Sequence, residues 1–108
     1  MEVSLNVMPP GKGMPFTHRH NANEEVYVFL NGIGEFLVDD EVIPIEPGTC
    51  IRCAPEAHRC WRNTGDEMMP FLCIQARAGS FVGDANVSDG EITSGPPDWT
   101  AIVGSGKS

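Results

Sequence analysis

The sequence is poor in basic residues. Lysine and arginine together number 7 against 15 aspartates and glutamates, which gives the 108-residue chain a net charge of −8 with histidine neutral. Proteins that bind the phosphate backbone of DNA or RNA need clustered Lys and Arg side chains. The composition therefore predicts a chain without a nucleic-acid partner. At this length we expect a single domain with one modest core.

Long apolar runs are also absent. No stretch approaches the roughly 18 residues that a membrane-spanning helix needs. Residues 1–15 lack the basic start and the long apolar centre of a signal peptide. We therefore expect no membrane partner and a cytoplasmic location.

Disulfide bonds are not expected, because nothing in the sequence indicates secretion. Cys50 and Cys53 form a C-x2-C pair, but side chains three positions apart in a strand point to opposite faces, which does not suit a zinc site. We expect buried, reduced thiols at all four cysteines, which are Cys50, Cys53, Cys60 and Cys73.

Segments with the apolar period of a helix are missing as well. Short runs rich in Val, Ile and Phe recur instead between Gly, Pro, Asn and Asp turn signals, which is typical of β-strands. We expect strands at Val3–Met8, Phe16–His20, Glu25–Leu30, Gly34–Val38, Glu41–Ile45, Thr49–Cys53, His58–Arg62 and Phe71–Arg77. This spacing predicts an all-β sandwich or barrel.

The composition changes near the C-terminus. Residues 79–108 are rich in Gly, Ser, Asp and Pro, which favours irregular structure. We predict a β-barrel over residues 1–78 and an irregular C-terminal arm over 79–108. The arm is expected to pack in places through Phe81, Ile92 or Trp99 and to end in a flexible tail.

The stretch THRHNANEEVYVFLNGIG carries a candidate metal site. In a strand, His18 and His20 point to the same face, about 6.5 Å apart along the chain. The turn NANE then brings Glu25 beside them on an antiparallel partner strand, while Glu24 faces the other way. Two imidazoles and one carboxylate suit a divalent transition metal such as Fe, Mn, Zn, Ni or Cu. The ordinary alternative is a pair of solvated histidines at a strand end.

The same residues carry a family resemblance. His18, His20, Glu25 and Gly32 form the pattern H-x-H-x4-E-x6-G, which resembles the first sequence motif of the cupins. Gly13 corresponds to the glycine that opens this motif, although it lies one residue closer to the first histidine. The H-x-H-x4-E-x6-G portion is the more specific part of the match.

The stretch EPGTCIRCAPEAHRCWRN resembles the second cupin motif, with counterparts at Gly48, Pro55 and Asn63. The resemblance covers roughly residues 13–77. It implies a double-stranded β-helix, also described as a jelly-roll or cupin barrel, with a metal ion inside near one mouth. It also implies that a histidine of the second motif completes the ligands of the first.

The fourth ligand depends on the phase of one strand. Counting forward from Pro55 puts Cys60 in the place of the motif histidine, and counting back from Asn63 puts Arg59 there. If residues 58, 60 and 62 face inward, His58 completes a four-ligand site, and we include His58 in the predicted set. If residues 59, 61 and 63 face inward, the indole of Trp61 fills the pocket and three ligands remain.

Four further residues are candidates for substrate binding. Tyr27 and Phe29 share the face of Glu25 and can line a pocket, although plain core packing explains them equally well. Arg59 can hold a carboxylate or phosphate through paired hydrogen bonds. Trp61 lies in the pocket if residues 59, 61 and 63 face the interior of the barrel.

The resemblance implies a small metal-binding cupin that acts on a small molecule, as a dioxygenase, isomerase or decarboxylase. The alternative is a non-catalytic cupin that binds or senses a small ligand, with a degenerate or empty metal site. A purely structural jelly roll would leave the histidines and Glu25 unexplained. Small cupins generally resemble one another in forming homodimers through an outer sheet face, and the N-terminal strand VSLNVM can contribute to such an interface.

Overall fold

The computed structural model describes residues 1–81 and 90–103. These residues form seven strands and one short helix. No helix among them is long and apolar enough to cross a lipid bilayer. The elements are β1 (Glu2–Met8), β2 (Asn23–Phe29), β3 (Gly34–Val38), β4 (Glu41–Ile45), β5 (Cys50–Cys53), β6 (Arg59–Asn63), β7 (Met69–Arg77) and α1 (Trp99–Val103).

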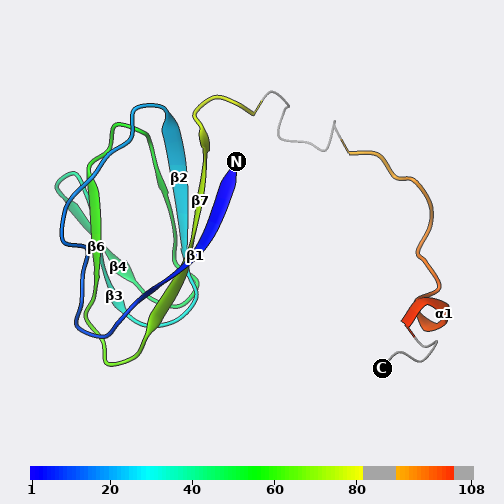
Figure 1. The fold of residues 1–108 in the computed structure, drawn as a ribbon, viewed down its shortest axis with the longest axis horizontal. Coiled ribbons are helices and arrows are strands. Elements are labelled where there is room, and N and C mark those ends of the chain that lie inside the picture. Colours follow the sequence, from blue (N-terminus) through cyan, green and yellow to red (C-terminus); the bar gives the residue numbers. More distant parts are fainter. Residues whose placement is uncertain (82–89, 104–108) are drawn as a thin grey trace.

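Two antiparallel sheets enclose the core. One has the strand order β1-β7-β2-β5 and the other β4-β3-β6, and Figure 1 shows β3, β4 and β6 opposite β1, β2 and β7. Buried and less buried positions alternate along β2 and β6, as the two-residue period of a strand requires. The arrangement is the predicted double-stranded β-helix. Its apolar core contains Met8, Tyr27, Phe29, Phe36, Ile45, Ile51, Cys53, Trp61, Met69, Phe71 and Cys73.

The predicted strand at Phe16–His20 is wrong. Residues 12–20 run along β6 and join it only through isolated bridges, Gly13 to Arg62 and His18 to Arg59. Pro15 interrupts the segment, because proline has no N–H to donate to a ladder. His18 therefore pairs with β6, and His20 bonds to Pro55 ahead of that strand, rather than either histidine pairing with the strand that carries Glu25. The other seven predicted strands are present, with ends shifted by at most two residues.

The described parts of the arm differ from the prediction in two ways. Phe81, Ile92 and Trp99 are mostly exposed, so the predicted packing through these side chains is not observed. The helix α1 was not predicted, and it begins after Asp98, whose carboxylate accepts a hydrogen bond from the amide of Ala101, as a helix cap does. Residues 82–89 and 104–108 of the predicted arm lie outside the described residues.

All four cysteines are free, as expected. Cys53 and Cys73 are buried and Cys60 is half-buried, but Cys50 is exposed, which corrects the expectation of burial at that position. The reason is the strand period, because Cys50 and Cys53 lie three residues apart on β5 and their side chains face opposite sides.

Candidate metal centre

His18 and His20 are held by backbone hydrogen bonds from an otherwise irregular segment. The amides of His18 and Arg59 each donate to the other residue's carbonyl, at 3.0 and 2.9 Å, and the amide of His20 donates to the carbonyl of Pro55 at 2.9 Å. These bonds hold the backbone from which both imidazoles project, and both side chains are partly exposed. The two rings lie nearly perpendicular, with centroids 5.3 Å apart.

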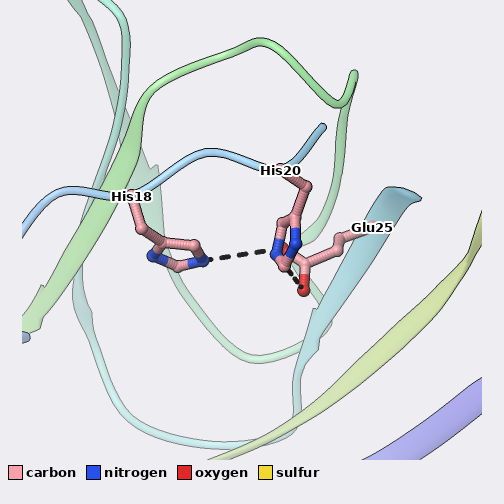
Figure 2. A group of neighbouring side chains, drawn as sticks. All are labelled: His18, His20 and Glu25. Atoms are coloured by element: carbon pink, nitrogen blue, oxygen red, sulfur yellow. Dashed lines mark ion pairs between the residues drawn. The ribbon is translucent and has the colours of Figure 1, made fainter. Parts of the chain in front are cut away.

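Glu25 completes a compact cluster with these histidines. His20 Nε2 lies 3.2 Å from Glu25 Oε2, and His18 Nε2 lies 3.8 Å from Glu25 Oε1. One ligand atom from each of the three residues lies within 4.8 Å of the others. Figure 2 shows both imidazoles directed toward the carboxylate, which projects from β2. The spacing in the sequence thus correctly predicted that these three residues meet.

The Glu25 carboxylate is almost completely buried and well supplied with donors. Its Oε1 atom accepts hydrogen bonds from the Tyr27 hydroxyl and from Arg59 Nη1, and its Oε2 atom accepts one from the Cys73 thiol. Burial by itself raises the pKa of Glu25, but the Tyr27 and Cys73 hydrogen bonds, together with the charges of His20 and Arg59, outweigh it. The pKa of Glu25 is therefore lowered, and the carboxylate is ionised at neutral pH.

Arg59 occupies the inward-facing position beside this carboxylate. Its side chain has no solvent exposure, and Nη1 lies 3.0 Å from Glu25 Oε1. Its Nη2 atom donates to the carbonyls of Ala54 and Pro55. A buried charge is tolerated only when it is paired and hydrogen-bonded. Both terminal nitrogens of this guanidinium meet these conditions, whereas its buried Nε atom has no hydrogen-bond partner among the described residues.

On β6, the side chains of Arg59, Trp61 and Asn63 face the interior of the barrel. These three residues are buried, whereas Arg62 is exposed. His58 precedes the strand and is exposed, and it is not part of the cluster among the described residues. The structure therefore does not bring His58 to the other three predicted ligands. Because Arg59 faces the interior instead, the site has three candidate ligands, His18, His20 and Glu25, with the Arg59 guanidinium beside them.

The other predicted site residues are all in the interior. Tyr27 and Phe29 are buried on β2, and Tyr27 contributes the hydroxyl that binds Glu25. The ring of Trp61 lies 5.9 Å from that of His18 and stacks on Phe36. Sequence reasoning missed Cys73, whose contact with Glu25 arises because Tyr27 and Cys73 are direct partners across β2 and β7. Only the pairing of distant strands reveals that contact.

The donor set fits a divalent transition metal. His20 Nε2 is buried and makes no hydrogen bond with the described residues, and a metal ion could replace the proton that lets this imidazole pair with Glu25 Oε2. Burial lowers the pKa of His18, which favours the neutral imidazole that metal ions bind. Two atoms bound to one ion at about 2.1 Å lie roughly 3.0–3.4 Å apart. The 3.2 Å between His20 Nε2 and Glu25 Oε2 falls in this range, whereas His18 Nε2, 3.8 Å from Glu25 Oε1, would have to move closer.

Comparison with known families agrees with the barrel and the cluster. The family model described as the cupin domain matches residues 4–75, which includes the three clustered residues and Arg59. The chain belongs to the cupin family. Glu24, which was predicted to face away from the site, pairs with Arg52 on the outer surface of the barrel, as the register of this cupin requires.

Several individual proteins resemble this cupin. A cupin protein from Bacteroides fragilis of known structure is 40% identical, with a TM-score of 0.79 over 85% of this chain and 77% of that chain. A predicted oxalate decarboxylase from Thermotoga maritima is 25% identical, with a TM-score of 0.65 over 69% of this chain and 64% of that chain. A glucose-6-phosphate isomerase of Pyrococcus abyssi is 38% identical over 97 residues, which cover 77% of this chain. The match spans about half (51%) of the isomerase.

Proposed function

We propose that this cupin binds a divalent transition metal through the imidazoles of His18 and His20 and the carboxylate of Glu25, and acts on a small molecule. The observation that carries the proposal is the buried Nε2 of His20, which forms no hydrogen bond with the described residues and lies at ion-pair distance, 3.2 Å, from Glu25 Oε2. An imidazole nitrogen that faces a carboxylate oxygen needs a positive charge between the two atoms, and a metal ion can replace a proton there. Three protein ligands leave open positions for water or substrate.

The residues around the centre position and charge its carboxylate ligand, and a bound metal would supply the reactive group. A metal held here supplies a Lewis acid that polarises a carbonyl or carboxylate oxygen, or that activates water or dioxygen. Arg59 and Tyr27 hold Oε1 of Glu25, and this leaves Oε2 directed toward His20. The hydrogen bonds from Tyr27 and Cys73, with the charges of His20 and Arg59, lower the pKa of Glu25 and keep its carboxylate ionised.

The names of two similar proteins indicate which type of reaction to expect. The similar proteins include a glucose-6-phosphate isomerase and a predicted oxalate decarboxylase, so an isomerase or a decarboxylase is the reaction class we favour over a dioxygenase. The metal we expect is Fe, Mn, Zn, Ni or Cu, because nitrogen and carboxylate ligands suit all of these ions.

A second candidate function is supported by Arg59. Its guanidinium already balances the Glu25 charge, so the site is electrically complete without a metal ion. In that case the protein is a non-catalytic cupin that binds or senses a small ligand. The metal content of the purified protein separates these two functions.

The test is elemental analysis of protein purified without a histidine tag and then reconstituted with Mn, Fe, Ni, Cu or Zn. We expect roughly one equivalent of one ion in the wild type and less than about a tenth of an equivalent in His20→Ala, because a lost ligand weakens binding at least tenfold. His58→Ala is the matched control, since His58 is exposed and should leave the metal content unchanged. A metal-free wild type that gains nothing on reconstitution supports the non-catalytic function instead.

We also propose that this cupin forms a homodimer through the outer face of its larger sheet. Val3, Leu5 and Val7 of the edge strand β1 are 57%, 67% and 49% exposed. Across β1 and β7, Leu5 pairs with Leu72, which continues the apolar face inward along the sheet. Exposed apolar patches of this kind mark interaction sites, and a twofold dimer covers the same patch on both copies.

Light scattering after size-exclusion chromatography tests the dimer. We expect twice the chain mass for the wild type and the single-chain mass for Leu5→Asp. Val42→Asp is the control, because Val42 is similarly exposed but lies on β4 in the other sheet. A wild type that elutes as a monomer at high concentration would rule the interface out.

A further inference from the structure

A cavity of about 230 Å³ opens beside the candidate metal centre. It lies where two sheet edges face each other, because β1 ends the larger sheet and β6 ends the smaller one. Met14 sits in this seam, and its amide donates to the carbonyl of Trp61 at 2.9 Å. The volume is close to that of about eight water molecules in the liquid, which suits a small molecule rather than a peptide.

Three residues that line the cavity also contact members of the candidate metal centre. Tyr27 and Cys73 line the cavity and both donate hydrogen bonds to Glu25. Trp61 lines it as well, and its ring lies 5.9 Å from that of His18. A molecule in the cavity is therefore one side chain away from the proposed metal ligands.

Among residues 1–81 and 90–103, no charged side chain lines the cavity. Its polar groups are neutral and come from Ser4, Asn6, Tyr27 and Cys73. The hydroxyl of Tyr27 and the thiol of Cys73 are engaged by the Glu25 carboxylate. An anion entering the cavity would lose hydration without meeting a positively charged side chain of the described residues in the cavity wall.

Arg59 does not supply that cation. Its side chain is fully buried, and its two terminal nitrogens are engaged by Glu25 and by backbone carbonyls. On the β1 wall, the Asn6 amide nitrogen donates to the hydroxyl and the carbonyl of Ser4. No group among the described residues donates to the Asn6 carbonyl oxygen, so this atom can accept a hydrogen bond from a ligand.

We infer that this cavity binds a small uncharged molecule beside the candidate metal centre, as a ligand separate from the substrate that a metal ion would contact. An apolar or aromatic body packs against Trp61 and Phe71, and a hydrogen-bond donor on the ligand reaches Asn6. The inference does not rest on the proposed function, because this binding requires no metal ion.

The test is an NMR titration of metal-free and metal-loaded protein with benzamide and benzoate, which share a ring and differ in charge. We expect saturable shifts of the Trp61 indole N–H and the Asn6 side-chain amide with benzamide and no such shifts with benzoate. The variant Trp99→Phe identifies the indole signal, because Trp61 and Trp99 are the two tryptophans. The neutral compounds phenol and 2-pyridone extend the probe set.

Asn6→Leu should weaken benzamide binding about three- to tenfold, the effect of losing one neutral hydrogen bond, and Ser4→Ala gives a second variant on the same wall. Asn31→Ala is the control, because Asn31 lines a different pocket. Benzoate binding as tightly as benzamide, or no neutral probe moving the Trp61 signal, would overturn the inference. Benzamide binding to a protein that takes up no metal would overturn the proposed function and leave the cavity assignment intact.

Discussion

Arg59 and Glu25 form a buried ion pair in the interior of the barrel, with Arg59 Nη1 3.0 Å from Glu25 Oε1. The pair joins β6 of the smaller sheet to β2 of the larger one. It therefore connects the two halves of the fold at the point where the histidines also converge. Each partner would be a lone buried charge without the other.

Arg59→Met should lower the free energy of unfolding by about 3–5 kcal/mol, because it leaves the Glu25 carboxylate buried without its cation. Urea unfolding followed by circular dichroism measures the loss. Combining Arg59→Met with Glu25→Gln should restore much of the stability, since no charge then remains. Arg62→Met is the matched control on the exposed face of the same strand, where its ion pair with Glu35 contributes about 1 kcal/mol or less. Equal losses for the two arginines would contradict the role of burial.

Arg59→His should increase the affinity for a divalent metal at least about tenfold, because it exchanges a nearby positive charge for a fourth nitrogen ligand. Competition against a coloured zinc chelator measures the change. Arg62→His adds the same side chain on the outer face of β6 and should have no effect. An affinity at or below that of the wild type would show that position 59 does not reach the ion.

Tyr27→Phe should destabilise the protein in a pH-dependent way. The folded pKa of Glu25 is lower than its ordinary value, to which the Tyr27 hydroxyl contributes, so the stabilisation is present above the ordinary pKa and is lost as pH falls through the folded pKa. At neutral pH we expect a loss of about 1.5–3 kcal/mol, the range for hydrogen bonds to charged groups. Urea unfolding at decreasing pH should show the wild type and the variant converging. A difference that is constant with pH would mean that the hydroxyl acts through packing alone.

Cys50 should react with iodoacetamide much faster than Cys53 or Cys73 in the folded protein. Cys50 is exposed and the other two are buried. Burial and the hydrogen bond to Glu25 also raise the pKa of Cys73 to about 12, and only the thiolate reacts. Mass spectrometry of native and denatured samples measures the labelling, and Cys50→Ser should remove the fast component. Rapid modification of Cys73 would indicate that the seam beside β1 opens readily.

The strand pattern and the cluster of His18, His20 and Glu25 could be predicted from the sequence. Alternating apolar positions between turn residues identify strands locally, and the spacing H-x-H-x4-E keeps three ligand residues close along the chain. The way the histidines reach Glu25 was less predictable. Their segment pairs with β6, about 40 residues away, and Pro15 prevents it from forming a regular strand.

The choice between His58 and Arg59 could not be made from the sequence. A one-residue shift in the register of a strand turns every side chain to the opposite face, and the observed register of β6 buries Arg59, Trp61 and Asn63. Composition also argues against burying arginine. Its burial depends on the carbonyls of Ala54 and Pro55 and on Glu25, and these partners come together only in the folded barrel.

The two hydrogen bonds between the backbones of His18 and Arg59 imply unequal attachment of the ligands. Glu25 belongs to β2, which is paired on both sides, by β5 and by β7. The histidines lie on residues 12–20, a segment that joins the edge of the smaller sheet only at isolated bridges. Edge segments with few bonds open at a lower free energy than the sheets beneath them. An ion held here would therefore exchange with solution at the rate of this local opening, while the rest of the barrel stays folded.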